Sequence, residues 1–341
     1  MSNKYDKPFL RYEEMIELLR SRNITIENED FAVKALSNMS YYTLVNGYKN
    51  SVLSIPGTDM FIPGTTFEEL YTLRTIDVSI GNLLLKHTLY IEGSLKSKIS
   101  YLVSRNYGVY TDPRNIKHDK PGDYLFRDHY SNARRNRNGT LKLLTETMSS
   151  TPKKGVFQSQ SLLHYIKQHN HIPPWILTTS LTFGQIIMWF TILKPADRLE
   201  ICNCFLSGSS LSDEEKKEYM KKSLDLLHEF RNIIAHGSRT ILDHGSVSIP
   251  KKQIISLSKG IITEQDYNSN IFARNGLFAV LTIIITLLND EYLIASFIGE
   301  LTFILKPFSR INIGGKSINE LFNLPNDIIE RLNISQANRK I

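Results

Sequence analysis

The stretch SDEEKKEYMKKSLDLLHEFRNIIAHG, residues 212–237, decides the fold, because it predicts one long amphipathic helix. Ser212 and Glu215 have the spacing of a capping box, which marks the start of a helix. Apolar residues then recur every three or four positions and predict one buried face: Met220, Leu224, Leu227, Phe230 and Ile234. Gly237 predicts the end of the helix, since glycine readily adopts the left-handed conformation that closes one.

The last turns of this predicted helix carry a polar motif, Arg231-Asn232-x-x-x-His236. A permanently charged guanidinium can hold a phosphate, and an imidazole can give or take a proton near neutral pH. Cleavage of an RNA backbone without a metal needs such groups. In the alternative interpretation, Arg231 forms a salt bridge and His236 caps the helix. The spacing alone does not decide, since Arg239 and His244 have it too.

The two outer residues of the motif do not face one another on a helix. Arg231 lies about 140° around the helix axis from His236, whereas Asn232 and His236 share one face. Either the arginine wraps around the helix, or a second copy of the chain completes the site, and we therefore expect a homodimer. Glu92 is a candidate to orient one of these side chains, and an ordinary surface glutamate is the alternative.

Composition limits the class of protein. Of 341 residues, 41% are hydrophobic, which is enough for a sizeable core, and the net charge of +7 favours a polyanionic partner. The two cysteines, Cys202 and Cys204, form neither a disulfide framework nor a zinc quartet, which favours a reducing compartment. The N-terminus lacks an apolar signal run, and the most apolar window, residues 277–288, is too short to span a bilayer. We expect a soluble, cytoplasmic protein without a metal site, a cofactor or a membrane partner.

Helical periodicity dominates the rest of the chain and predicts an all-α fold. We expect an N-terminal helical module over residues 1–65 and a larger helical domain over residues 66–341. Helices are predicted at residues 13–20, 29–44, 67–106, 161–168, 183–193, 195–205, 272–288 and 291–305. After the motif helix, residues 243–270 are expected to form a long irregular loop, with short strands at 247–249 and 254–257.

Basic side chains gather in residues 107–138, which we expect to be an insertion in the larger domain. The candidates for RNA contact are Arg114, Lys117, Arg127, Arg134, Arg135 and Arg137. Aromatic residues lie between them: Tyr124, Phe126 and Tyr130. Cations attract phosphates and exposed rings stack on bases, so this composition suits single-stranded RNA. The alternative is a solvated loop whose arginines face water.

Four blocks of the sequence, in order over residues 7–240, resemble the Abi (abortive infection) bacteriophage-resistance family, of the AbiD/AbiF kind. They are Lys7-Pro8-Phe9-Leu10 with residues 12–19, Tyr41-Tyr42-x-Leu44 with Gly47-Tyr48, Pro173-Pro174-Trp175-Ile176 with residues 181–184, and the motif at residues 231–236. That family is similar to the HEPN superfamily, whose Arg-x4-6-His motif serves metal-independent RNA cleavage. The resemblance implies an all-α HEPN-like bundle, two motif copies facing one another, and phage defence by damage to RNA.

The motif, the charge and the resemblance together predict a metal-independent endoribonuclease with Arg231, Asn232 and His236 as its catalytic residues. A non-catalytic RNA-binding regulator or scaffold is the first alternative, and it needs the basic segment but not His236. A protein-interaction module is the second, and it predicts no salt-sensitive RNA binding. An active ribonuclease harms its own cell, so we expect restraint by an antitoxin protein, a small regulatory RNA or an assembly switch.

Overall fold

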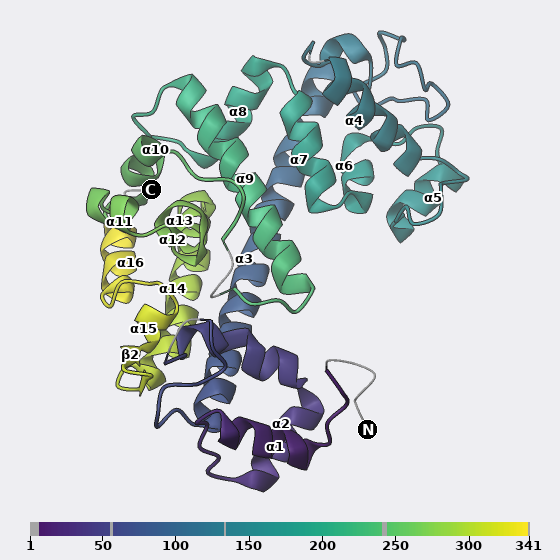
Figure 1. Cartoon of the computed structure of the whole chain (residues 1–341). Helices are drawn as coiled ribbons and strands as arrows, with labels where there is room; N and C mark the ends of the chain where they lie inside the picture. Colours follow the sequence, from purple (N-terminus) through teal and green to yellow (C-terminus); the bar gives the residue numbers. More distant parts are fainter. Residues whose placement is uncertain (1–6, 55–56, 133, 241–243, 340–341) are drawn as a thin grey trace. The chain divides into compact units, whose positions relative to one another are not determined.

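The computed structural model of the chain describes residues 7–54, 57–132, 134–240 and 244–339. Its described elements are helices, apart from one short hairpin, which confirms the predicted all-α class (Figure 1). The chain divides into two compact units. Unit 1 comprises Met1–Leu83, Ile233–Asp243 and Ser296–Asn333, and unit 2 comprises Leu84–Asn232, His244–Ala295 and Ile334–Ile341.

Unit 1 combines elements from the N-terminal and C-terminal parts of the chain. Its N-terminal elements are α1 (Tyr12–Ser21), α2 (Glu29–Asn38), the π-helix η1 (Tyr42–Asn46) and the 3-10 helix η2 (Lys49–Ser51). Its C-terminal elements are η5 (Lys306–Phe308), β1 (Asn312–Ile313), β2 (Lys316–Ser317) and α15 (Ile318–Leu321). The two strands pair antiparallel, with Asn312 opposite Ser317. All described residues of the N-terminal module expected at 1–65 lie in this unit.

Among the described helices, four contain a boundary between the units: α3 (Phe67–Tyr107), α9 (Asp213–Ala235), α14 (Glu291–Leu305) and α16 (Ile328–Ala337). α3 is a single helix of 41 residues, so Gly81 and Gly93 do not interrupt it. A glycine inside a helix costs about 1 kcal/mol relative to alanine, which the packing of so long a helix readily offsets.

Unit 2 contains two groups of helices. The first has η3 (Arg127–His129), α4 (Arg134–Thr147), α5 (Gln160–Gln168), α6 (Pro174–Leu177), η4 (Thr178–Ser180) and α7 (Phe183–Ile192). The second has α8 (Pro195–Phe205), α10 (Lys251–Ser258), α11 (Glu264–Ser269), α12 (Phe272–Asn275) and α13 (Leu277–Leu287). α4 packs on α7 in the first group, and α13 packs on α10 and α12 in the second (Figure 1).

α13 lies at the centre of the core of unit 2. Every residue from Leu277 to Leu287 is buried, so the most apolar window of the sequence is a core helix. Gly276 separates α12 from α13 because its backbone is extended, with φ −111° and ψ −162°. The single helix expected at residues 272–288 is therefore two helices. In the part of the chain that the structure describes, no helix has both the length and the apolar character to cross a membrane.

The segment after α9 differs from the expectation. Residues 251–258 and 264–269 form α10 and α11, so the irregular loop expected at 243–270 is partly helical and the strand expected at 254–257 is wrong. Ile254 and Leu257 are buried, and α10 packs on α13. Their spacing of three suits a helix, and contact with α13 makes a helix the conformation that buries both.

Candidate functional site

α9 carries the candidate site, and its start is capped as the sequence predicts. The Ser212 N–H donates to the Glu215 carboxylate at 2.9 Å, and the Glu215 N–H donates to the Ser212 hydroxyl at 3.4 Å. The ammonium of Lys252, with the hydrogen bonds from Ser212, lowers the pKa of Glu215 to about 2. Four of the five apolar residues expected to be buried are buried, namely Met220, Leu224, Leu227 and Phe230, and Ile234 is half-buried.

The end of α9 places His236 directly after the last helical residue, Ala235. Gly237 has a φ of +70°, a conformation that glycine adopts without steric cost, as predicted for the residue that closes the helix. The N–H groups of Gly237 and Ser238 donate to the carbonyls of Ile234 and Ile233 at 2.9 and 3.0 Å. The closing turn leaves His236 exposed to solvent.

Three polar side chains of α9 contact one another in unit 2. Arg231 Nη1 donates to Asn232 Oδ1 at 3.3 Å, and Asn232 Nδ2 lies 3.3 Å from His228 Nε2. Arg231 Nε is buried and has no hydrogen-bond partner among the described residues. The salt bridge considered for Arg231 does not form within the described ranges. The guanidinium charge of Arg231 is therefore not neutralised there by a paired carboxylate.

His228 belongs to this cluster, although the motif pattern leaves it out. Its ring lies against Gly184 of α7, where an added Cβ would be only 3.0 Å from His228 Nε2. Phe183 meets the ring edge-on, with centroids 6.0 Å apart. Burial, and then the charge of Arg231, lower the pKa of His228 and favour its neutral form. The signal for His228 in the sequence is its position four residues before Asn232, on the same helix face.

Glu92 is buried in α3 and is not an ordinary surface glutamate. It forms an ion pair with Lys96 at 2.7 Å, while its second carboxylate oxygen is buried without a hydrogen-bond partner in the described chain. The carboxylates of Asp225 and Glu229, and after them that of Glu92, raise the pKa of His228 against the larger effect of burial. The ion-pair partner of Glu92 is therefore Lys96 on its own helix.

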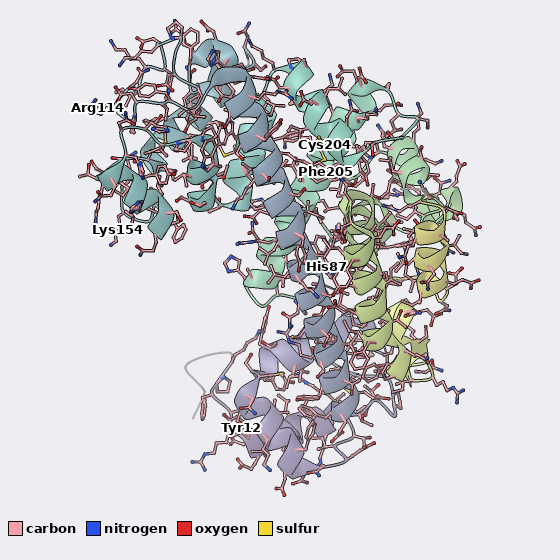
Figure 2. All side chains as sticks on the ribbon, turned by 180° about the vertical axis from the view of Figure 1, so that it is seen from behind. Tyr12, His87, Arg114, Lys154, Cys204 and Phe205 are labelled. Atoms are coloured by element: carbon pink, nitrogen blue, oxygen red, sulfur yellow. The ribbon has the colours of Figure 1, made fainter. Side chains whose placement is uncertain are left out.

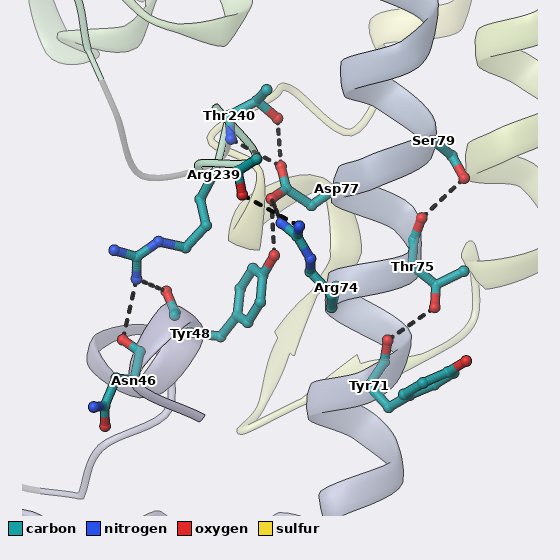
Figure 3. A network of polar contacts seen from close by, with 11 residues as sticks. Asn46, Tyr48, Tyr71, Arg74, Thr75, Asp77, Ser79, Arg239 and Thr240 are labelled. Atoms are coloured by element: carbon teal, nitrogen blue, oxygen red, sulfur yellow. Dashed lines mark hydrogen bonds and ion pairs between the residues drawn. The ribbon is translucent and has the colours of Figure 1, made fainter. Parts of the chain in front are cut away.

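A buried polar network in unit 1 holds the residues that follow His236 (Figure 3). Asp77 accepts hydrogen bonds from the Thr240 N–H at 3.0 Å, from the Thr240 hydroxyl, and from the Tyr48 hydroxyl at 2.8 Å. Arg74 donates to the Gly237 carbonyl at 3.2 Å. Burial raises the pKa of Asp77, and the hydrogen bonds from Thr240 and Tyr48 counteract that increase. These contacts fix the backbone on the C-terminal side of the motif.

Arg239, the arginine of the second Arg-x4-His match, has a structural role. Its Nη1 donates to the carbonyl of Asn46 at 3.1 Å and to that of Gly47 (Figure 3). Gly47 belongs to the second sequence block, so that block supports the segment after the motif. Of the two arginines with this spacing, Arg231 is the better candidate for binding a ligand.

The exposed cations of the basic segment lie in unit 2. Arg114, Lys117 and Arg127 are exposed, and Figure 2 shows Arg114 at the outer edge of the unit. Arg114 pairs with Asp112 at 3.1 Å, and no ion pair of Lys117 occurs within the described ranges. Free and weakly paired cations on a surface can contact phosphates.

Arg137 differs from these three, because it is only 9% exposed. Its Nη1 donates to the Arg127 carbonyl at 3.3 Å and lies 3.4 Å from Asn132 Oδ1. Arg137 therefore holds the loop of the basic segment at Arg127 and Asn132. Arg134 and Arg135 contribute backbone to α4, but their side chains lie outside the described residues.

Two aromatic residues of the basic segment are structural. Tyr124 and Tyr130 are buried, and their hydroxyls donate to the carbonyls of Ile172 and Tyr124, each at 2.9 Å. The expectation that these two rings stack on bases is therefore wrong, since a base needs an exposed ring face. Phe126 is half-buried and meets His129 edge-on. Sequence composition does not distinguish a ring that anchors a loop from one that faces solvent.

The structure thus brings Arg231 and Asn232 together with His228 in unit 2, while His236 belongs to unit 1 and is exposed. Among the residues that the structure describes, no three His, Cys, Asp or Glu side chains gather where a metal ion could bind. The motif itself offers a guanidinium, an amide and an imidazole.

Comparison with known families agrees with these features. The model of a family described as Abi-like protein matches residues 34–241, which is more than half of the chain and includes the motif with the segment anchored by Asp77. The chain belongs to the Abi-like protein family, which assigns it to abortive-infection phage defence. No curated protein and no solved structure matches it.

Proposed function

We propose that the protein acts in phage defence as a metal-independent endoribonuclease. The observation that carries this proposal is the state of Arg231, a half-buried guanidinium without a paired carboxylate in the described chain, five residues before an exposed histidine, His236. A cation that is partly removed from water and not neutralised by an acid is suited to bind an anion. The net charge of +7 is in keeping with RNA as that anion.

In the proposed reaction, the 2′-hydroxyl of RNA attacks the adjacent phosphorus and the bond from phosphorus to the 5′ oxygen breaks. His236 accepts the proton of the 2′-hydroxyl, and the departing 5′ oxygen takes up a proton, which gives a cyclic phosphate and a 5′-hydroxyl end. Arg231 stabilises the extra negative charge on the phosphate in the transition state. DNA lacks the 2′-hydroxyl and is not a substrate of this reaction.

His228 has a positioning role in this proposal. In its neutral form it can accept a hydrogen bond from Asn232 Nδ2, which turns Asn232 Oδ1 toward Arg231. The amide then holds the guanidinium of Arg231 in one orientation. The protonated ring would offer Asn232 only donors, so burial of His228 serves the arrangement of the motif.

The proposal includes a homodimer. Continued helical spacing would place position 236 about 140° around the axis from Arg231, and His236 lies just beyond the last residue of α9. A second copy of the chain then supplies the proton for the departing 5′ oxygen through its own His236. Analytical ultracentrifugation of the full chain tests this part, and a monomer at the concentration of full activity would contradict it. The function also calls for a cytoplasmic location, where RNA is present, and for restraint by an antitoxin protein, a small RNA or an assembly switch.

Cleavage of labelled RNA in EDTA tests the chemistry directly. We expect the wild-type chain and a control variant, His164→Ala on α5, to cut, and His236→Ala and Arg231→Ala to be at least about 100-fold slower. His164 is exposed and lies outside the motif. Loss of wild-type cutting in EDTA, or full activity in both motif variants, refutes the mechanism. Circular dichroism confirms that each variant folds.

A non-catalytic RNA-binding regulator is the second candidate. It is favoured by a basic pocket in unit 2 that is lined by Lys117, Arg127 and Arg137 and contains no residue of the motif. Plating of phage on cells that carry His236→Ala separates the two functions. Protection that survives the substitution means that RNA binding is sufficient, and protection that is lost supports catalysis.

A further inference from the structure

The basic segment of unit 2 forms a pocket and not only a surface. Its cavity has a volume of about 710 Å3 and lies between the loop around residues 116–132 and the N-terminal half of α4. Its polar lining includes Lys117, His118, Arg127, Asn132, Arg137 and Lys142. A cavity of this size is in the range that admits a small molecule such as a nucleotide.

The charge of the lining is positive. Four cationic side chains face two carboxylates, those of Asp119 and Asp128. Lys117 and Lys142 are exposed, and neither forms an ion pair within the described ranges. Asp128 forms long ion pairs with Arg127 at 3.8 Å and with Arg137 at 4.0 Å. The two lysines are therefore free to neutralise a ligand, and the pocket selects for an anion.

Two buried polar groups of the lining have an unused hydrogen-bonding atom. His118 is 5% exposed and its Nδ1 has no partner in the described chain, and the same holds for Nε of Arg137, which is 9% exposed. A buried donor or acceptor without a partner costs about 1–3 kcal/mol, so such atoms are rare unless a ligand or water completes them.

The backbone of His118 adds to this cost. It has a φ of +51°, in the left-handed region that residues other than glycine seldom adopt, and its ring Nε2 lies 3.4 Å from the Thr145 hydroxyl. Strain of this kind persists where the surrounding structure holds it, often at a binding site. The pocket therefore combines free cations, unsatisfied buried nitrogens and a strained residue in one place.

We propose that this pocket binds the phosphate monoester of a nucleotide or of an RNA end. A monoester carries more negative charge than the diester inside an RNA chain and offers three oxygens to the cations. A monoester is attached to a sugar on one side only, whereas an internal phosphate is flanked by two sugars. The monoester can therefore enter a concave site more readily than an internal phosphate can. The site is independent of cleavage, because it uses neither Arg231 nor His236.

The test compares two RNAs that differ only in one phosphate. A short 2′-O-methyl RNA, which lacks the nucleophile and cannot be cut, carries either a 5′-phosphate or a 5′-hydroxyl, and fluorescence anisotropy measures its binding to the full chain. We expect the 5′-phosphate to raise the affinity about tenfold, as one added charge-assisted contact does. An unlabelled nucleoside monophosphate should compete if free nucleotides are ligands, and only the phosphorylated RNA should compete if the site requires an RNA end.

A double charge reversal in the pocket tests whether the preference for the 5′-phosphate arises there. Lys117→Glu with Lys142→Glu should abolish the preference for the 5′-phosphate, whereas Lys167→Glu, an exposed lysine of α5 outside the pocket, should retain it. All three positions are exposed, so the variants should fold. Equal binding of the two RNAs, binding of neither, or equal losses in the pocket variant and the control would each overturn the proposal. Cleavage plays no part in these measurements, so the ribonuclease proposal can fail without affecting them.

Discussion

Asp77 and Thr240 are joined by two hydrogen bonds, from the threonine N–H at 3.0 Å and from its hydroxyl, across 163 positions of the sequence (Figure 3). Asp77 is 2% exposed and Thr240 is 1% exposed. This contact fixes the backbone four residues after His236, so a residue of α3 outside the motif determines how the chain continues from it.

Replacement of Asp77 by alanine should lower the free energy of unfolding by about 3 kcal/mol, because it leaves the buried Thr240 N–H and the Tyr48 hydroxyl without their acceptor. Asp77→Asn should cost less, since its amide oxygen still accepts from Thr240 and its amide can donate to the Tyr48 oxygen. Urea unfolding measures both. Equal costs for the two substitutions would show that the hydrogen bonds of Asp77 are not what stabilises this segment.

Gly184→Ala should disturb the motif through His228. The added Cβ would lie 3.0 Å from His228 Nε2, so the ring must move, and its contact with Asn232 lengthens. We expect a stability cost of about 1–2 kcal/mol and, if the chain cleaves RNA, a cleavage rate about tenfold lower.

Gly93→Ala is the matched control, because a Cβ at that position of α3 meets no atom within 4 Å. Alanine should raise the free energy of unfolding there by about 0.5–1 kcal/mol, since it favours the helix. Cleavage unchanged by Gly184→Ala, or lowered to the same extent by both substitutions, would contradict the role given to the contact between Gly184 and His228.

His228 should make stability depend on pH. Its pKa is lowered in the folded chain, mainly by burial, whereas in the unfolded chain it is about 6.5. The unfolded chain therefore binds more protons between these two values, and the free energy of unfolding rises with pH through that window. The stability that neutral His228 contributes is fully present above about pH 6.5, its pKa in the unfolded chain. It is lost as the pH falls through the pKa of His228 in the folded chain.

The variant His228→Gln should show a smaller increase in unfolding free energy between pH 5 and pH 7.5 than the wild-type chain. Some dependence should remain, because burial also lowers the pKa of His118 and His129. Urea unfolding over a series of pH values gives the slopes. Identical slopes in the variant and the wild-type chain would mean that His228 does not contribute to this dependence.

Tyr124→Phe should lower the free energy of unfolding by about 1–2 kcal/mol, because the buried carbonyl of Ile172 loses its donor. Tyr110→Phe is the control, since Tyr110 is 48% exposed and should tolerate the loss of its hydroxyl within about 0.5 kcal/mol. Thermal unfolding compares the two. A cost no larger for Tyr124 than for Tyr110 would show that the hydrogen bond from Tyr124 to the Ile172 carbonyl does not stabilise the fold.

Several elements follow from local sequence alone. The capping box at Ser212, the apolar positions along α9 and the stop at Gly237 depend on residues within a few positions of one another, so the sequence predicts this helix closely. The same local reasoning fails at Gly276, which divides one apolar stretch into two helices, and at residues 254–257, where a spacing of three and a short apolar run suit either a helix or a strand.

The sequence by itself determined that the chain is helical, that Arg231 and Asn232 lie near the end of a long helix that Gly237 closes, and that the charge of the chain suits an acidic partner, because periodicity, capping and composition are properties of neighbouring residues. Only the tertiary structure decided that His228 joins the motif against Gly184, that Asp77 holds Thr240, and that Tyr124 is buried. Those relationships join residues on different helices and loops. Burial of a side chain depends on which distant parts of the folded chain pack against it, and neighbouring residues do not specify that packing.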